Sequence, residues 1–333
     1  MNDRSPLQSL ADGNWFKLIC GASFQDVALI RNLTLAYSLA GADCIDVAAD
    51  KAVITAALEG MVVAGRQPWL MVSVNDGEDP HFRKAHFNAR LCPPHCPRPC
   101  EKICPALAID EKGVIEDRCY GCGRCIPICP LNLIEAEPRR ASIQEILPWI
   151  ETGALKAVEI HTQIGHEEDF LRLWKILAPS AENLGLLAIS CQDGPGLMGY
   201  LKFLLETIQF LPCPLIWQTD GRPMSGDIGK GTTHPAIKMA QKVLSRDLPG
   251  FVQLAGGTNA HTVRKLKEMG LLKRENERGI AGVAYGSYAR SLLMPILQQL
   301  PPDDPFLENH PQHLRASVKL ASELVHQIKN LDI

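Results

Sequence analysis

The chain has 333 residues, of which 46% are hydrophobic, and its net charge is −3 at pH 7. This length suffices for one large domain or two ordinary ones. The near-zero charge and scattered basic residues argue against a nucleic-acid surface, and no run of eighteen apolar residues is present to form a transmembrane helix. The N-terminal stretch lacks the apolar core of an export signal, so we expect a soluble, cytoplasmic protein.

Apolar runs and helical patterns alternate along most of the chain. Near-continuous apolar runs are typical of parallel strands that are covered on both faces. Eight such runs lie at residues 16–23, 43–49, 68–74, 157–164, 185–191, 214–220, 250–257 and 279–286. Helical patterns separate them, and the first two end with Gly41 and Gly65 as predicted C-caps. Eight strand–helix units predict a (β/α)₈ barrel, with an open doubly wound sheet as the alternative.

The third unit differs from the others because its helix does not follow its strand directly. Residues 80–140, rich in Pro and Cys, intervene before a helical pattern at 142–153. Without this insert about 270 residues remain, close to the ~250 of an ordinary barrel. The sequence therefore predicts a barrel formed by residues 1–79 and 141–333, with a module of residues 80–140 inserted after strand three. Such loops build the face that carries barrel active sites.

The insert holds eight of the twelve cysteines. In a reducing compartment such clustering indicates metal ligation rather than disulfides. The segment "CYGCGRCIPICP" has the C-x₂-C-x₂-C-x₃-C-P spacing of a bacterial [4Fe–4S] ferredoxin, with the ligands Cys119, Cys122, Cys125 and Cys129. Gly121 and Gly123 would let the backbone turn tightly around a cluster. Zinc is the alternative, although zinc motifs usually separate two C-x₂-C pairs by a longer loop.

A looser motif, "CPPHCPRPCEKICP", precedes it and contributes Cys92, Cys96, Cys100 and Cys104. Its prolines forbid a helix through the first three cysteines. By analogy with two-cluster ferredoxins, ligation is expected to cross between the motifs. One cluster would take Cys104, Cys119, Cys122 and Cys125, and the other would take Cys92, Cys96, Cys100 and Cys129. For the second, a [3Fe–4S] cluster or zinc stays open, and His95 is an alternative ligand although a solvent-facing or hydrogen-bonding role is favoured.

The loops after strands seven and eight are the usual phosphate site of a barrel. Gly256, Gly257, Gly286 and Ser287 would offer backbone N–H groups to a phosphate or another anion, such as that of FMN. Glycines that merely permit tight turns are the alternative. The loop at 219–235 lacks the Walker spacing and is either a lid or an irregular surface loop. These loops are weakly similar to those of the flavin mononucleotide barrels of the dihydroorotate dehydrogenase class.

Other polar residues at strand ends show no diagnostic spacing, and hydrogen bonding in the barrel mouth is the expected role of each. They are Ser23, Asp46, Asp50, Asn75, His161, Gln163, Gln192, Asp193, Gln218 and Asp220. The four cysteines outside the insert, Cys20, Cys44, Cys191 and Cys213, are expected to be buried core thiols.

With these motifs placed in a barrel, the chain resembles the cyanobacterial light-dependent period (LdpA) family over nearly its whole length. The resemblance is carried by the cysteine segment from Cys92 to Arg140, by "LICGASFQDVALIRNLTLAYSLAGADCIDVAAD" and by "LAGGTNAHTVRKLKEMG". It implies an iron–sulfur protein that feeds redox state, and so light input, to the circadian clock. It also implies contact with the clock input proteins KaiA and CikA.

Two functions of different classes follow. The first is a redox sensor whose clusters respond to a ferredoxin or quinone pool and whose barrel is a scaffold. The second is an FMN-dependent oxidoreductase in which the clusters pass electrons to a flavin at strands seven and eight. The lack of a recognisable acid–base constellation favours the sensor.

Overall fold

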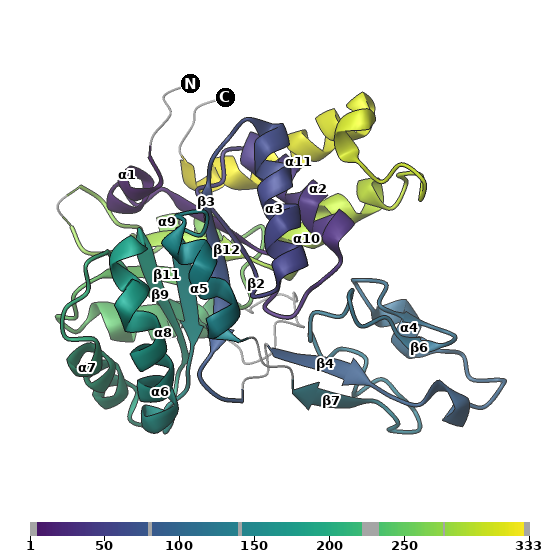
Figure 1. Cartoon of the computed structure of the whole chain (residues 1–333), viewed down its shortest axis with the longest axis horizontal. Coiled ribbons are helices and arrows are strands. Elements are labelled where there is room, and N and C mark those ends of the chain that lie inside the picture. Colours follow the sequence, from purple (N-terminus) through teal and green to yellow (C-terminus); the bar gives the residue numbers. More distant parts are fainter. Residues whose placement is uncertain (1–4, 79–81, 139–141, 222–232, 276, 330–333) are drawn as a thin grey trace.

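Eight parallel strands close into a barrel in the order β1-β12-β11-β10-β9-β8-β3-β2 (Figure 1). This computed structural model describes residues 5–78, 82–138, 142–221, 233–275 and 277–329. The barrel strands are β1 (Trp15–Ile19), β2 (Cys44–Ala48), β3 (Trp69–Asn75), β8 (Ala157–His161), β9 (Leu186–Gln192), β10 (Leu215–Asp220), β11 (Phe251–Ala255) and β12 (Ile280–Tyr285). Each of the eight predicted runs overlaps one barrel strand, and no strand extends more than one residue beyond its run. The open sheet is wrong, because β1 pairs with both β12 and β2.

Helices surround the barrel in the predicted alternation. They are α2 (Val27–Leu39), α3 (Lys51–Ala64), α5 (Ile143–Glu151), α6 (Glu167–Leu177), α7 (Leu197–Ile208), α8 (Thr233–Leu244), α9 (Thr262–Glu268) and α10 (Ser287–Leu297). Gly65 caps α3 with a φ of +59°, as predicted, whereas α2 ends at Leu39 with Ala40 as its C-cap. Asp26 and Asp50 cap the N-termini of α2 and α3, so Asp50 has a structural role at its strand end.

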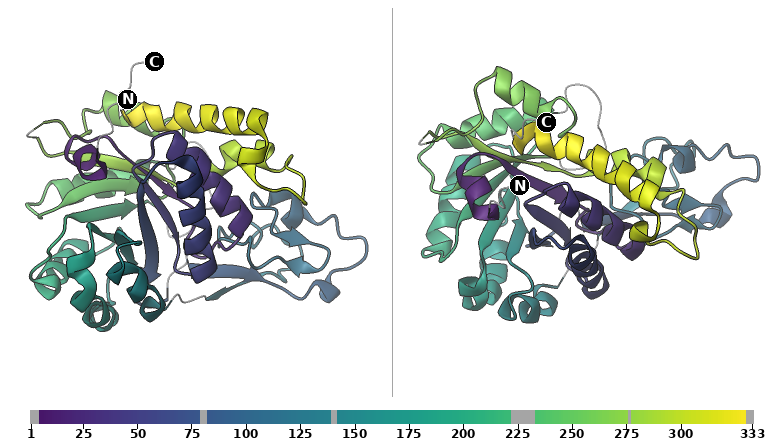
Figure 2. Two further views of the ribbon diagram at one scale, coloured as in Figure 1. Left: turned by 45° about the horizontal axis from the view of Figure 1, so that its top comes forward. Right: turned by 90° about the horizontal axis from the view of Figure 1, so that it is seen from above.

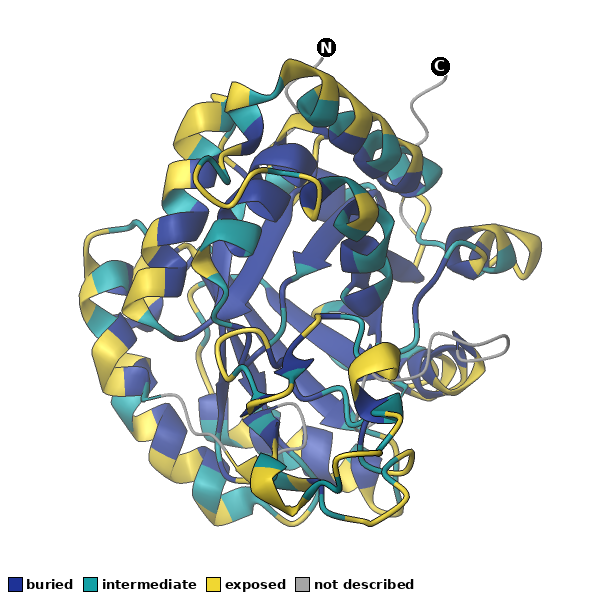
Figure 3. Ribbon diagram, turned by 90° about the vertical axis from the view of Figure 1, so that its right-hand side faces the viewer, coloured by how far each residue is buried: buried dark blue, intermediate teal, exposed yellow. Residues whose placement is uncertain are grey.

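Two α-helices of the barrel part were not predicted. Helix α1 (Pro6–Ala11) precedes the first strand, and α11 (Pro311–Lys329) follows the last strand–helix unit after the short η4 (Leu307–Asn309). Helix α11 packs against α10 and α2. Figure 3 shows the buried residues concentrated in the strands and on the inward faces of the helices. Within the described residues, no helix combines the length and apolar character needed to cross a membrane.

The chain between β3 and α5 forms two small antiparallel sheets, and we call its described residues 82–138 the cysteine module. Strand β4 (Arg83–His86) pairs with β7 (Glu135–Pro138), and β5 (Ile109–Asp110) pairs with β6 (Gly113–Val114). Short helices η2 (Ala89–Leu91) and α4 (Pro99–Ile103) lie between β4 and β5. The module projects from one side of the barrel in both views of Figure 2. The predicted borders at 79–80 and 140–141 lie outside the described residues.

The loop between β1 and α2 holds the module against the barrel. The Gln25 backbone N–H donates to the Asp117 carbonyl over 2.7 Å, and Lys84 Nζ donates to Gln25 Oε1 over 2.7 Å. Arg118 Nε lies 3.2 Å from Asp26 Oδ2. Since this loop follows the carboxyl end of β1, the module sits at the end of the barrel where active sites form.

Polar side chains cross the barrel interior, which ordinarily holds bulky branched residues. Trp15 Nε1 donates to Gln253 Oε1 over 2.6 Å, and Gln253 Nε2 donates to Gln218 Oε1 over 2.5 Å. Gln218 Nε2 in turn donates to Glu159 Oε1 over 2.5 Å. This series of hydrogen bonds links β1, β11, β10 and β8 through buried side chains that find their partners within the barrel.

We expect Gly282→Val to lower the free energy of unfolding by about 1–3 kcal/mol, because overpacked interiors cost this much. A Cβ on Gly282 would lie 2.5 Å from Trp15 Cδ1 and 2.7 Å from the Trp15 carbonyl oxygen. Urea denaturation followed by circular dichroism measures the loss. Gly199→Ala is the control, because Gly199 lies in α7 with nothing within 4 Å of an added Cβ, and it should gain about 0.5–1 kcal/mol. Unchanged stability of Gly282→Val would show that Trp15 can move aside.

Candidate metal centres and the barrel mouth

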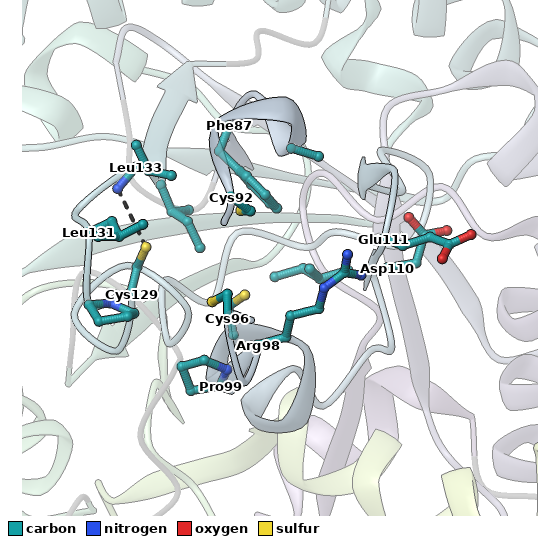
Figure 4. A pocket seen from close by; sticks show the side chains of 15 residues that line it. Phe87, Cys92, Cys96, Arg98, Pro99, Asp110, Glu111, Cys129, Leu131 and Leu133 are labelled. Carbon is teal, nitrogen blue, oxygen red and sulfur yellow. Dashed lines mark hydrogen bonds between the residues drawn. The ribbon is translucent and has the colours of Figure 1, made fainter. Parts of the chain in front are cut away.

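Four of the eight motif cysteines line one cavity in the module, and we call them the outer set. They are Cys92, Cys96, Cys100 and Cys129. Figure 4 shows Cys92, Cys96 and Cys129 around this space. Phe87, Leu131 and Leu133 are among the apolar residues that complete its wall. The outer set therefore combines three cysteines of the first motif with the last cysteine of the second.

The other four motif cysteines, Cys104, Cys119, Cys122 and Cys125, form the inner set. Burial and then the neighbouring thiols of Cys122, Cys119 and Cys104 raise the pKa of Cys125 to about 12. Cys119 and Cys125 are buried, and the other two are partly buried. The structure thus brings together the two sets that crossed ligation requires. That each set binds a cluster stays a prediction.

Both motifs end in the same local backbone structure. In the first, the Leu107 and Ala108 N–H groups donate to the carbonyl and the Sγ of Cys104, each over 3.2 Å. In the second, the Asn132 and Leu133 N–H groups donate to the carbonyl and the Sγ of Cys129, over 3.1 and 3.4 Å. Leu107 and Asn132 have φ values of +48° and +52°, which non-glycine residues seldom adopt. In both motifs, a residue with positive φ therefore directly precedes the residue whose N–H group donates to the ligand sulfur.

These N–H groups have electrostatic consequences for the thiols. Burial raises the pKa of Cys129, but the backbone N–H groups of Leu133, Leu131, Ile134 and Asn132 outweigh it and hold this pKa below the usual value. The Ala85 N–H donates to Cys119 Sγ over 3.4 Å in the inner set. Hydrogen bonds to ligand sulfur are one means by which proteins set the potential of an iron–sulfur cluster.

The four outer thiols line a cavity instead of converging on a single point. Within the described ranges, no group of three or more His, Cys, Asp or Glu side chains is arranged to hold one metal ion. Gly121 and Gly123 both have φ of +73°, so they turn the backbone as predicted. His95 is exposed and does not line the outer cavity. The donor set of four thiols around a space fits a multi-iron cluster.

A second cavity lies at the mouth of the barrel and brings the four predicted anion-site residues together. Gly256, Gly257, Gly286 and Ser287 line it with Ser73, Glu159, His161, Gln218, Asp220 and Arg290. Tyr120 of the cysteine module also lines it. Gly256 and Gly257 have φ of +65° and +92°, so the turn after β11 requires glycine whether or not a ligand binds. The predicted loop at 219–235 falls largely on residues 222–232, which lie outside the described residues.

Beneath this cavity lies a buried charge cluster that the sequence analysis missed. Lys17 Nζ donates to Glu159 and, over 3.2 Å, to Asp46 Oδ2. His161 Nε2 lies 2.8 Å from Glu159 Oε1, and Ser73 Oγ donates to Asp46 Oδ1 over 2.8 Å. Asp46, His161 and Gln218 are among the predicted strand-end residues, whereas Lys17 and Glu159 lie within apolar runs and were not candidates. A charge within an otherwise apolar strand was the available signal.

The pKa values of the charged side chains in this cluster are shifted in different directions. Burial raises the pKa of Glu159, but Lys17 and His161 outweigh it and hold this pKa at about 2. Burial raises the pKa of Asp46 to about 6 even though Lys17 opposes the change. Burial also lowers the pKa of Lys17, but Glu159 and Asp46 raise it above the ordinary value. Glu159 is therefore the ionised partner that keeps Lys17 charged.

Arg290 connects the mouth cavity to the inner set. Its guanidinium lies 3.8 Å from the centre of the Tyr120 ring and donates to the Ile19 and Cys20 carbonyls over 3.2 and 2.5 Å. Burial raises the pKa of the Cys122 thiol, and Arg124 and Arg290 both lower it. Only 5% of Arg290 is exposed. A single buried cation thus acts electrostatically on the cavity and on a predicted cluster ligand.

The remaining sequence candidates have structural partners or lie in the core. Asp193 Oδ2 pairs with Lys242 over 2.5 Å, and Gln163 donates to the Glu78 carbonyl. Ser23 is buried, Asn75 donates to the Gly77 carbonyl, and Gln192 lies beside Asp220 in a separate open pocket. Cys20, Cys44 and Cys191 are buried as predicted, whereas Cys213 is only partly buried.

Comparisons with known proteins agree with this organisation. Residues 92–140 match the model of the LdpA Fe–S cluster-binding domain, and residues 149–327 match that of the light dependent period A C-terminal domain. The chain is 52% identical to Light dependent period A of Synechococcus elongatus over 99% of this chain and 95% of that protein.

Two solved structures are similar to the chain at low identity. A putative fructose-1,6-bisphosphate aldolase from Coccidioides immitis has a TM-score of 0.49 and 12% identity, over 98% of this chain and 97% of that chain. The tryptophan synthase alpha subunit of Legionella pneumophila has a TM-score of 0.39 and 10% identity, over 96% and 94%. The barrel assignment rests on the strand pairing and not on these likenesses. From its sequence relatives, the chain belongs to the light dependent period A family and is an iron–sulfur protein.

Proposed function

We propose that this protein senses cellular redox state through two [4Fe–4S] clusters and relays that state to the circadian clock. The observation that carries the proposal is the sorting of eight cysteines into an inner and an outer set of four, each drawn from both motifs. The looser spacing of the first motif leaves a [3Fe–4S] cluster as the alternative at the outer set, and the iron content distinguishes the two.

The chain's own residues would set how each site responds to an electron. Bound clusters supply reversible one-electron transfer. The Ala85, Ala108 and Leu133 N–H groups stabilise negative charge on the ligand sulfurs. Arg290 adds a buried positive charge near Cys122 of the inner set only. Arg98 lines the outer cavity, but its side chain is 39% exposed, so Arg290 is the more buried of the two cations. The inner and outer sets should therefore differ in potential, with the inner one favoured for reduction by its buried cation.

The outer set is the proposed entry point for electrons. Five of the large apolar side chains exposed on the described surface lie within the module, at Leu91, Ile103, Leu107, Ile128 and Leu131. Exposed apolar side chains are common where another protein docks, so these five support the module as the docking site of a protein electron donor. A ferredoxin, or a carrier linked to the quinone pool, is the proposed donor.

The proposed partners are those that the family resemblance implies. Clock input proteins such as KaiA and CikA are the proposed partners, and the cytoplasm is the proposed location. In this scheme residues 80–140 form the redox module and residues 1–79 and 141–333 form the barrel that supports it. The hydrogen bond from Lys84 to Gln25 holds the module against the barrel. It is the proposed contact through which a structural change in the module would be transmitted to the barrel surface.

A flavin-dependent oxidoreductase is the second candidate, because the mouth cavity abuts Tyr120 beside the inner set. Here FMN would occupy the strand seven and eight loops, and the clusters would pass electrons to it. His161, held 2.8 Å from the ionised Glu159, is the proposed proton-transfer group of this second function.

Anoxic purification followed by iron, sulfide and flavin analysis of one sample separates these functions. The sensor predicts about eight irons and eight sulfides per chain, with no flavin released on denaturation. About seven irons would identify a three-iron outer cluster. Stoichiometric flavin would place the enzyme first, and a chain that binds zinc without sulfide would refute the cluster assignment.

A further inference from the structure

Arg290, on helix α10 of the barrel, carries a buried positive charge that faces the cysteine module. We propose that Arg290 is the counter-ion of the inner cluster, so that a barrel residue raises the potential of that cluster and reduction of the cluster in turn tightens the contact between module and barrel. This inference rests on the proposed redox function and names the step by which a redox change reaches the barrel. Arg290 is a positioning residue in this scheme, because it is not a ligand of iron.

The first argument compares Arg290 with two other buried cations of the barrel. Lys17 and Arg31 each form ion pairs with carboxylates. Arg290 donates instead to two backbone carbonyls, those of Ile19 and Cys20, and within the described ranges no carboxylate forms an ion pair with it. Carbonyl groups satisfy N–H donors but do not neutralise a full charge, and a buried charge without a counter-charge is costly.

The carboxylates that line the mouth cavity together with Arg290 do not supply this counter-charge. Glu159 is paired with Lys17. Asp220 directs its Oδ1 atom toward Gly256, where it would overlap an added Cβ. The module is the other element that borders Arg290, so the counter-charge is expected there.

The second argument is the contact between Arg290 and the module. The guanidinium carbon lies 3.8 Å from the centre of the Tyr120 ring and 5.4 Å from the centre of the Phe24 ring. Tyr120 directly follows Cys119 and precedes Cys122 by two residues. The ring that covers Arg290 is therefore carried by the backbone that holds two inner thiols. The positive charge of Arg290 also lowers the pKa of Cys122, in agreement with this proximity.

A cluster held by the inner set would supply the negative charge that Arg290 lacks. Four thiolates outweigh the positive charge of an iron–sulfide core, and reduction adds one further negative charge. The electron comes from the proposed protein donor, which is oxidised by that one electron. Arg290 compensates the added charge without the movement of a proton. Because Arg290 is buried, its charge acts more strongly than one in water and is screened little by salt.

Thermodynamic linkage makes the effect reciprocal. If Arg290 favours the reduced cluster by a given factor, reduction favours the docked position of the module beside Arg290 by up to the same factor. The packing here is tight, because a Cβ on Gly21 would lie 3.1 Å from Tyr120 Cβ and 3.6 Å from an Arg290 nitrogen. The same loop carries the Gln25 backbone N–H, which donates to the Asp117 carbonyl of the module over 2.7 Å. This N–H group therefore reports on the docked position.

Redox titration of the anoxically purified full chain, followed by electron paramagnetic resonance, measures the potential of each cluster. Arg290→Gln should lower the reduction equilibrium constant of the inner cluster about tenfold, which is ~59 mV for a one-electron couple, and should change the outer one less than about twofold. Arg290→Lys keeps the charge and should restore most of the potential. Arg124→Gln is the matched comparison, because Arg124 also lowers the pKa of Cys122 but belongs to the module, and it should lower the same potential.

Hydrogen–deuterium exchange of the oxidised and the dithionite-reduced wild type tests the reciprocal effect. We expect the Gln25 N–H to exchange up to about tenfold more slowly in the reduced protein. The Gly185 N–H, which donates to the Lys156 carbonyl just before β9, is the internal control and should exchange equally in both states. Arg290→Gln should abolish the difference at Gln25, whereas Arg124→Gln should retain it.

Two results would overturn the inference. One is an Arg290→Gln protein that holds both clusters at unchanged potentials, and the other is a wild type whose Gln25 exchange does not depend on redox state. The second measurement decides the question even if Arg290→Gln does not fold. Iron and sulfide analysis separates these results from a failure of the proposed function: a wild type with about eight irons and no effect of Arg290 refutes this inference alone, whereas a wild type without sulfide refutes both.

Discussion

Combining Cys104→Ala with Cys122→Ala should remove no more iron than either substitution alone, about half of the total. Combining Cys104→Ala with Cys100→Ala should remove nearly all of it. In the structure Cys104 neighbours Cys119 and Cys122, whereas the pKa of Cys100 is raised by burial and then by Cys129 and Cys92. The two members of the first pair therefore belong to one site, and those of the second pair belong to different sites.

Iron and sulfide per chain, with the electron paramagnetic resonance spectrum of the reduced protein, measure this result. Alanine is used because a serine oxygen can replace a thiolate as an iron ligand. Cys191→Ala is the matched control, since Cys191 is a buried core thiol in β9, and it should retain full iron. If ligation followed each motif separately, the two double variants would exchange their behaviour. That exchange would refute the crossed assignment, although the protein would still be shown to bind clusters.

Replacing Lys17 with Met should lower the free energy of unfolding at pH 7 by about 3–5 kcal/mol, because it leaves buried carboxylates without their cation. Lys17 is fully buried between Glu159 and Asp46. Adding Glu159→Gln and Asp46→Asn to Lys17→Met removes the stranded charges and should recover most of the loss. Denaturant unfolding of the three proteins measures both effects.

The dependence on pH separates a charge effect from a packing effect. The folded pKa of Glu159 is about 2, below the ordinary value near 4.3. Its contribution to wild-type stability is therefore complete above about pH 4.3 and is lost as the pH falls toward 2. The deficit of Lys17→Met should be largest above that range and shrink below it. A deficit that is constant with pH, or that neutral partners do not rescue, would assign the loss to packing.

Alternation of apolar and amphipathic segments was enough to predict the barrel, because every strand of a closed parallel sheet is covered on both faces. The division of the thiols into an inner and an outer set came from analogy with two-cluster ferredoxins, because the spacing within one motif does not show which cysteine crosses to the other. The Lys17–Glu159 cluster could not be predicted, since its members lie on β1 and β8 and meet only across the closed barrel. Helix α11 was not predicted, because it follows the eighth strand–helix unit and no strand directly precedes it.

The pairing of β3 with β8 across the inserted segment has a consequence for how the chain folds. Five residue pairs, from Met71↔Ala157 to Asn75↔His161, join strands that residues 76–156 separate. This connection is roughly threefold longer than the average one in a ~250-residue barrel. Loop-closure entropy grows only with the logarithm of length, so the added cost is about 1 kcal/mol. We therefore expect the barrel to close before iron arrives, so that iron starvation would leave a folded scaffold ready to receive its clusters.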